Sequence, residues 1–186
     1  MTGYIILGVL VLLVLYVILT YNNIVRSNNE IDKAFGSVDA MLKKRYDLIP
    51  NLVEVVKQYM IHESTVLTEV TKLRTSYSEN MTSEDKIDLH NKITSKVSGL
   101  LYNVENYPDL KANQNFLHLQ ASWNEAEEQI SAARRYYNSA VTDYNNSIQT
   151  FPSSIIAKQM GFKHKNVFEI SEEERKNINA KELFAK

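Results

Sequence analysis

Few residues of this 186-residue chain are spaced in a way that could carry out chemistry. His62 and Glu63 begin the helical His-Glu-x-x-His pattern that binds zinc in metalloproteases, but Val66 stands where the second histidine would be. We therefore interpret His62 as a partly exposed helix position. A di-metal carboxylate bundle would need a glutamate three residues before each histidine, and the positions three residues before His62, His90 and His118 hold no carboxylate.

The composition excludes further classes of function. Five scattered glycines could hardly build a phosphate-binding loop, and the absence of cysteine excludes disulfides and thiolate metal sites while leaving the redox compartment open. With a formal net charge of −1, the chain lacks the strong excess of positive charge that is typical of nucleic-acid-binding proteins. We predict no catalytic residue, no cofactor, no metal and no small-molecule substrate, and therefore a non-enzymatic protein.

Polar side chains beside the apolar helical seams are the remaining candidates for a site. Most of them surround one proline, and the others flank a later seam. The candidate patch comprises Arg45, Asp47, Pro50, Asn51, Glu54, Glu127, Arg134 and Asn138. It either recognises a partner or fixes helix register through interhelical ion pairs and hydrogen bonds. The basic run Lys43-Lys44-Arg45 is either a solvated face or a contact for anionic lipid.

The elements that carry this patch are amphipathic helices. Apolar residues recur at alternating steps of four and three from Ile24 through Leu52 to Leu73, which is typical of a helix packed against other helices. Asn28 and Glu63 are polar breaks at two positions of this seam. The phase is unchanged across Pro50, so we expect one helix kinked at the proline. Together with the apolar segment before it, this helix would form a rod of roughly 100 Å from Tyr4 to about Tyr77.

Two more long helices follow in the prediction. Thr82 or Ser83 caps the first of them, which runs to about Asn106 and is closed by Pro108. The other runs to about Thr150 with alanines and tyrosines alternating along its seam.

A short fourth helix, 155–160, is expected to stop at Gly161. Residues 162–168 look extended, with apolar side chains available to dock. Ser171 and Glu174 form a capping box for a charged terminal helix.

The N-terminal segment has the length and composition of a membrane anchor. Residues 4–19 are apolar throughout, and the helix from Gly3 to Tyr21 would span about 28 Å, close to a bilayer core of roughly 30 Å. A signal peptide would need a basic start and a small-x-small cleavage site, which the flanking residues lack. We predict a single span through residues 4–21 that contacts the lipid bilayer.

The distribution of positive charge predicts the orientation of this span. No Lys or Arg precedes it, whereas Arg26, Lys33 and the 43–45 run follow it. The positive-inside rule then places the N-terminus outside and the C-terminal domain in the cytoplasm.

Several short motifs, in order and over nearly the whole chain, together resemble the LemA family of bacterial membrane proteins. They are Tyr21-Asn22-Asn23-Ile24-Val25, residues 44–53 around Pro50, residues 105–113 around Pro108, Ala133-Arg134-Arg135-Tyr136-Tyr137-Asn138, Tyr144-Asn145, Phe151-Pro152 and Gly161-Phe162. The resemblance implies one N-terminal span in the bacterial inner membrane and a cytoplasmic antiparallel helical bundle. It implies no agreed enzymatic activity and no catalytic residues.

The sequence therefore predicts an all-α fold, in which a transmembrane helix continues into an antiparallel bundle of three long helices plus a short fourth. Its expected parts are an anchor at 1–22, a bundle at 23–168 and a charged tail at 169–186. One hypothesis for its function is a scaffold that self-associates as a homo-oligomer, with parallel anchors favouring a ring. The other is a monomeric sensor or adaptor that captures another protein through the kink region or the terminal helix.

Overall fold

The computed structural model describes residues 1–60 and 64–168, and all of its regular elements there are helical. The fold class predicted from the sequence is confirmed, because an apolar N-terminal helix leads into several helices that pack together. The His62-Glu63 pair, the seam position at Glu63 and the capping box of Ser171 and Glu174 lie outside the described residues.

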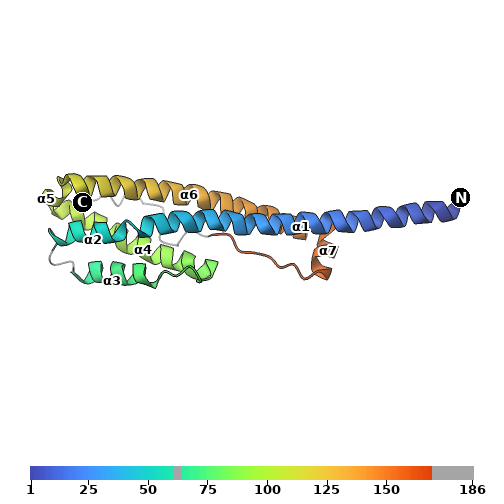
Figure 1. Ribbon diagram of the computed structural model, residues 1–186, viewed down its shortest axis with the longest axis horizontal. Helices are drawn as coiled ribbons and strands as arrows, with labels where there is room; N and C mark the ends of the chain where they lie inside the picture. The colour runs from blue at the N-terminus through green and yellow to red at the C-terminus, as the bar shows by residue number, and fades with distance from the viewer. Residues whose placement is uncertain (61–63, 169–186) are drawn as a thin grey trace, which may run out of the picture.

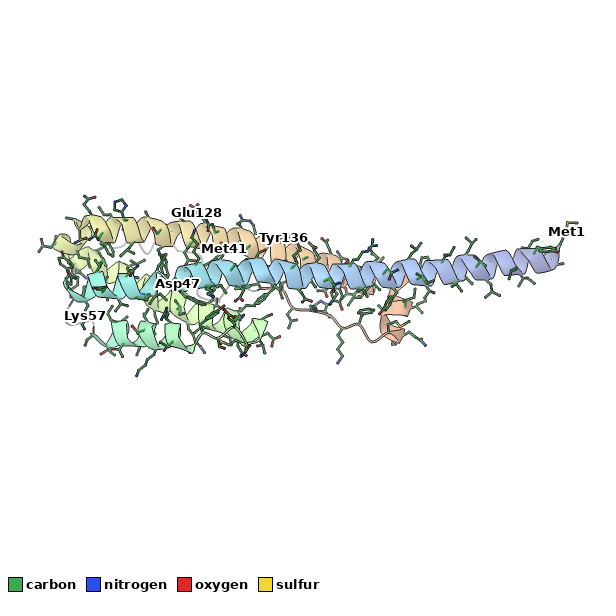
Figure 2. The ribbon with its side chains drawn as sticks, in the orientation of Figure 1. Met1, Met41, Asp47, Lys57, Glu128 and Tyr136 are labelled. Atoms are coloured by element: carbon green, nitrogen blue, oxygen red, sulfur yellow. The ribbon has the colours of Figure 1, made fainter. Side chains whose placement is uncertain are left out.

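Two long antiparallel helices form the framework of the bundle. They are α1 (Thr2–Tyr46) and α6 (Gln114–Gln149), which lie side by side in Figure 1. The N-terminal part of α1 projects beyond the bundle, and residues 1–19 are all exposed. Their side chains point into open space around the helix (Figure 2). The rest of α1 buries one apolar face, which includes Ile24, Ile31, Val38 and Leu42.

The predicted rod from Tyr4 to Tyr77 is wrong, because α1 ends at Tyr46 and α2 (Ile49–Lys57) begins after a two-residue turn. The amide of Leu48 bonds to the carbonyl of Arg45 at 3.1 Å, so the regular helical ladder is interrupted before the proline. Pro50 consequently lies in the first turn of α2, where its missing N–H leaves no helical bond unmade.

A second difference follows after α2. Helix α3 (Ser64–Ser76) does not extend the rod but packs beside α2 and α4 (Figure 1). The apolar period stays in phase because each short helix must bury one face toward the same core. Periodicity reports which face of a helix is buried, and it does not report whether the next turn continues in the same direction.

The second predicted long helix is α4 (Ser83–Asn103), which continues into a 3-10 turn at Val104–Asn106. The side chain of Thr82 accepts a hydrogen bond from the amide of Asp85, so the predicted cap is confirmed. The third predicted helix is divided into α5 (Pro108–Lys111) and α6, and the side chain of Asn113 caps α6.

The last described helix, α7 (Ser153–Gln159), packs against both α6 and α1. Gly161 follows it with a φ of 76°, which is the left-handed conformation expected of a glycine stop. Residues 162–168 then run back along α6 without regular structure, and Phe168 is buried.

Candidate functional site

The centre of the bundle holds a fully buried arginine. Arg45 lies in the last turn of α1, where the helix dipole favours a positive charge. Its guanidinium donates hydrogen bonds to Glu127 of α6, to Thr94 Oγ1 at 2.9 Å and to His90 Nδ1 at 2.8 Å. Three helices are therefore joined at one side chain. We call Arg45, His90, Thr94, Trp123 and Glu127 the Arg45 cluster.

His90 acts as a neutral acceptor in this cluster. An arginine can only donate, so the Nδ1 atom of His90 must carry a lone pair toward it. Burial, followed by the positive charges of Arg45 and Arg134, lowers the pKa of His90 to about 2. The ring is therefore uncharged near neutral pH, and Arg45 occupies the lone pair of its Nδ1 atom.

Aromatic rings complete the surroundings of the buried charge. The guanidinium carbon of Arg45 lies 5.1 Å from the ring centroid of Trp123 and 5.5 Å from that of Tyr46. Such contacts offset part of the cost of removing a cation from water. Two buried polar atoms, Arg45 Nε and the Tyr46 hydroxyl, have no hydrogen-bond partner among the described residues. Burial raises the pKa of Tyr46 to about 12.

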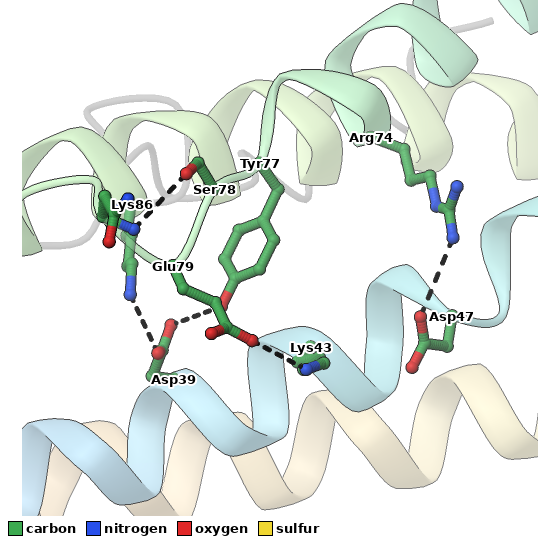
Figure 3. A network of polar contacts seen from close by, with 9 residues as sticks. Asp39, Lys43, Asp47, Arg74, Tyr77, Ser78, Glu79 and Lys86 are labelled. Atoms are coloured by element: carbon green, nitrogen blue, oxygen red, sulfur yellow. Dashed lines mark hydrogen bonds and ion pairs between the residues drawn. The ribbon is translucent and has the colours of Figure 1, made fainter.

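A second polar cluster joins α1 to the α3–α4 connection, as Figure 3 shows. Asp39 accepts hydrogen bonds from the Tyr77 hydroxyl at 2.9 Å and from Lys86 Nζ at 2.8 Å, and Lys86 is itself buried. Burial, and then the hydrogen bond to Asp39, raise the pKa of Tyr77. The exposed pairs Lys43–Glu79 and Asp47–Arg74 flank it at 3.0 and 3.9 Å.

Two asparagines attach residues 162–168 to α6. Asn138 donates to the carbonyl of Phe168 at 3.0 Å and accepts from its amide at 2.7 Å. Asn145 makes the same paired contact with Lys165, at 2.8 and 3.0 Å. Seven helical residues rise about 10.5 Å and three extended residues span about 10 Å, so the two pairs are in register.

Phe168 connects this segment to the Arg45 cluster. Its ring centroid lies 5.7 Å from that of His90, and the guanidinium of Arg134 lies over it at 4.3 Å. Arg134 and Asn138 of the predicted patch therefore both contact Phe168, and the ring of Phe168 in turn contacts His90 in the bundle interior.

The structure divides the predicted patch into separate places. Arg45 and Glu127 meet in the core, and Asp47 reaches Arg74 at the surface. Pro50, Asn51 and Glu54 are exposed on α2. The last two line an open hollow of about 460 Å³, together with Val55, Gln58, Asn115, His118 and Leu119.

The sequence prediction did not assign Asp39, Tyr77 or His90 to a site, although all three belong to the two clusters. A signal existed on α4, where Lys86 and His90 fall in phase with buried Ile93 and Val97. Polar residues in phase with an apolar seam must find partners inside the bundle.

The contacts of these clusters join helices. Among the described residues no group of three or more His, Cys, Asp or Glu side chains could hold a metal ion. The same residues contain one helix that is long and apolar enough to cross a membrane, and its apolar window is entirely unburied. Fold and site together define a helical-bundle protein with an N-terminal helix that fits a membrane anchor.

The chain belongs to the LemA family, whose model matches residues 34–181. Protein LemA of Metamycoplasma hominis is 28% identical over 163 residues, which cover 87% of this chain and 74% of that protein. The magnetosome proteins MamQ 1 and MamQ 2 of Paramagnetospirillum magneticum are each 22% identical over 181 residues. Those matches cover 82% of this chain and 65% of each relative, so the chain spans just under two thirds of their length. Family membership and the exposed apolar helix both fit a membrane-associated protein.

Proposed function

We propose that the protein is a non-enzymatic, membrane-anchored helical scaffold that self-associates at the cytoplasmic face of the bacterial inner membrane. The continuity of α1 carries this proposal, because one uninterrupted helix contains both the exposed apolar segment and the core face that ends at Arg45. A rigid connection gives every copy the same orientation relative to the bilayer. Identical chains in one plane are the default partners for a symmetric assembly.

The Arg45 cluster supports a structural role over catalysis. The Nδ1 atom of its histidine already accepts a hydrogen bond from Arg45, and a guanidinium does not release a proton near neutral pH. What the cluster supplies is a fixed register between α1, α4 and α6, which a scaffold needs in order to present one surface.

The absolute mass of the full-length protein in mild detergent tests self-association, with the fragment from Arg26 onward measured beside it. A single discrete multimer of the full-length chain is the expected result. Monomers of both would refute the scaffold. Orientation is tested separately by labelling Tyr102→Cys, 78% exposed in the parent, in a chain that has no other cysteine. Labelling only in inverted membrane vesicles is expected.

The second candidate is a monomeric, membrane-tethered adaptor, and a groove favours it. Val53, Met60 and Leu67 give a largely apolar lining to a hollow of about 620 Å³ between α2 and α3. Lys57, Ser64, Thr68, Thr71 and Lys72 complete its rim. A monomeric mass would favour the adaptor if a protein partner also binds and that binding is lost in Thr68→Arg, a change on the exposed rim of the groove that keeps the fold.

A further inference from the structure

We propose that the corner made by the end of α6, by α7 and by the residues just after it is a second membrane-contacting surface. It would lie in the interfacial layer of the same bilayer that α1 crosses. The inference rests on the proposed function, because it takes the N-terminal part of α1 as a membrane span. We call Phe151, Ile155, Lys158, Met160 and Lys163 the corner surface.

The position of the corner is fixed relative to the span. Helix α7 packs against α1 at the end of the bundle that faces the N-terminus (Figure 1). The ring of Phe162 lies 6.0 Å from the ring of Tyr21, which follows the exposed apolar run ending at Leu19 by only two residues. Two residues advance a helix by about 3 Å, so the corner is level with the end of the span.

The corner exposes large apolar side chains where water would otherwise cover them. Phe151 is 76% exposed, Ile155 61% and Met160 53%. Tyr102 in the last turn of α4 and Leu117 in the first turn of α6 are also exposed, but they lie at the opposite end of the bundle (Figure 1). Single exposed apolar residues are ordinary, but a group that adjoins a membrane span has a ready apolar environment.

The charge of the corner suits anionic headgroups. From Tyr144 through Phe168 the sequence contains no acidic residue and three lysines, although the whole chain has a net charge of −1. Lys165 lies 3.8 Å from Asp32, whereas Lys158 and Lys163 are exposed. Arg26 of α1 adds another exposed positive charge near the same level. Lysines flanking apolar side chains are the pattern of surfaces that lie in a membrane interface.

A second copy of the chain suits the corner less well. A symmetric contact would place the lysines of one corner against those of the other, and like charges repel. The bilayer surface, in contrast, lies beside the corner in every copy of the chain, so no second protein is needed to cover the exposed apolar side chains.

The absence of cysteine allows a direct test in the full-length protein. Single variants Ile155→Cys, Leu13→Cys and Tyr102→Cys carry an environment-sensitive fluorophore in vesicles of phosphatidylethanolamine and phosphatidylglycerol. The quencher is a nitroxide on the lipid acyl chain, placed near the bilayer centre for position 13 and on the upper part of the chain for positions 155 and 102. Leu13 reports insertion of the span, and Tyr102 is an exposed position outside the corner.

We expect loss of emission at positions 13 and 155, and none at position 102. Adding Phe151→Ser and Met160→Ser should restore emission at 155 without changing it at 13, whereas adding Leu117→Ser should have no effect. Quenching at 13 without quenching at 155 would overturn the corner surface and leave the anchor intact. No quenching at 13 would instead refute the anchor. Emission at 155 that changes when the protein is diluted with more lipid, at a constant fraction of nitroxide lipid, would identify a second copy and also overturn the proposal.

Discussion

Arg45 and Glu127 form an ion pair across α1 and α6 in which the arginine is fully buried and the glutamate side chain is about one third exposed, at 32%. The pair is asymmetric, because the cation depends on the protein for its solvation and the anion still reaches water. Loss of the anion therefore leaves an uncompensated charge in the core, which is the costly way to break a buried pair.

Glu127→Ala should lower the free energy of unfolding by about 3 kcal/mol, since Arg45 would keep only neutral partners. Urea unfolding of the full-length protein in detergent, followed by the fluorescence of its single tryptophan, measures this directly. Trp123 lies in the same cluster and reports its opening. Glu128→Ala changes an exposed neighbour and should have an effect within about 0.5 kcal/mol.

Replacing both partners provides the complementary variant. Arg45→Met with Glu127→Leu removes both charges from the core and should cost less than Glu127→Ala alone. A larger loss for the double variant would show that packing around Arg45, and not its charge, dominates.

The depressed pKa of His90 predicts a loss of stability in acid. The unfolded histidine binds a proton below about pH 6.5, whereas the folded one does so only near pH 2, so protonation favours the unfolded state across that interval. Between pH 6.5 and 5 the loss from this residue should be about 2 kcal/mol. Urea unfolding at both pH values should show this difference, and His90→Gln should remove it.

His118→Gln is the matched control, because this histidine is exposed on α6 and lies outside the Arg45 cluster. It should leave the pH dependence of the parent unchanged. An equal pH dependence in the parent and in His90→Gln would mean that other groups cause the acid loss.

The paired hydrogen bonds of Asn138 should hold the end of the 162–168 segment. Asn138→Ala removes two of them, worth together about 2 kcal/mol, so protection of the Phe168 amide from hydrogen exchange should fall about 30-fold. Asn146→Ala, at an exposed position on the same helix, should leave that protection unchanged. Unchanged protection in Asn138→Ala would show that burial of the Phe168 ring suffices.

Pro50 tests the break between α1 and α2. In the first turn of α2 the proline is well accommodated, so Pro50→Ala should change the free energy of unfolding by less than about 1 kcal/mol. The same urea titration measures it. A gain of about 3 kcal/mol would instead indicate a strained kink within a continuous helix.

Some parts of this protein follow from local sequence alone. The apolar segment before Tyr21, the buried faces around Leu42 and Ile130, the cap at Thr82 and the stop at Gly161 were all predictable. Each depends on interactions within a few residues or on the period of one helix, so the local sequence contains the necessary information.

Other parts were decided only when the helices met. The apolar seam from Ile24 to Leu73 is compatible with one straight helix and also with separate helices that turn back on each other. Only the packing of α3 beside α2 and α4 distinguishes the two arrangements. The three hydrogen-bond partners of Arg45 are 45, 49 and 82 residues away, and the segment held by Asn138 begins well beyond its own helix. A helical period identifies the buried face, but the identity of the facing residues depends on long-range pairing, which no local pattern encodes.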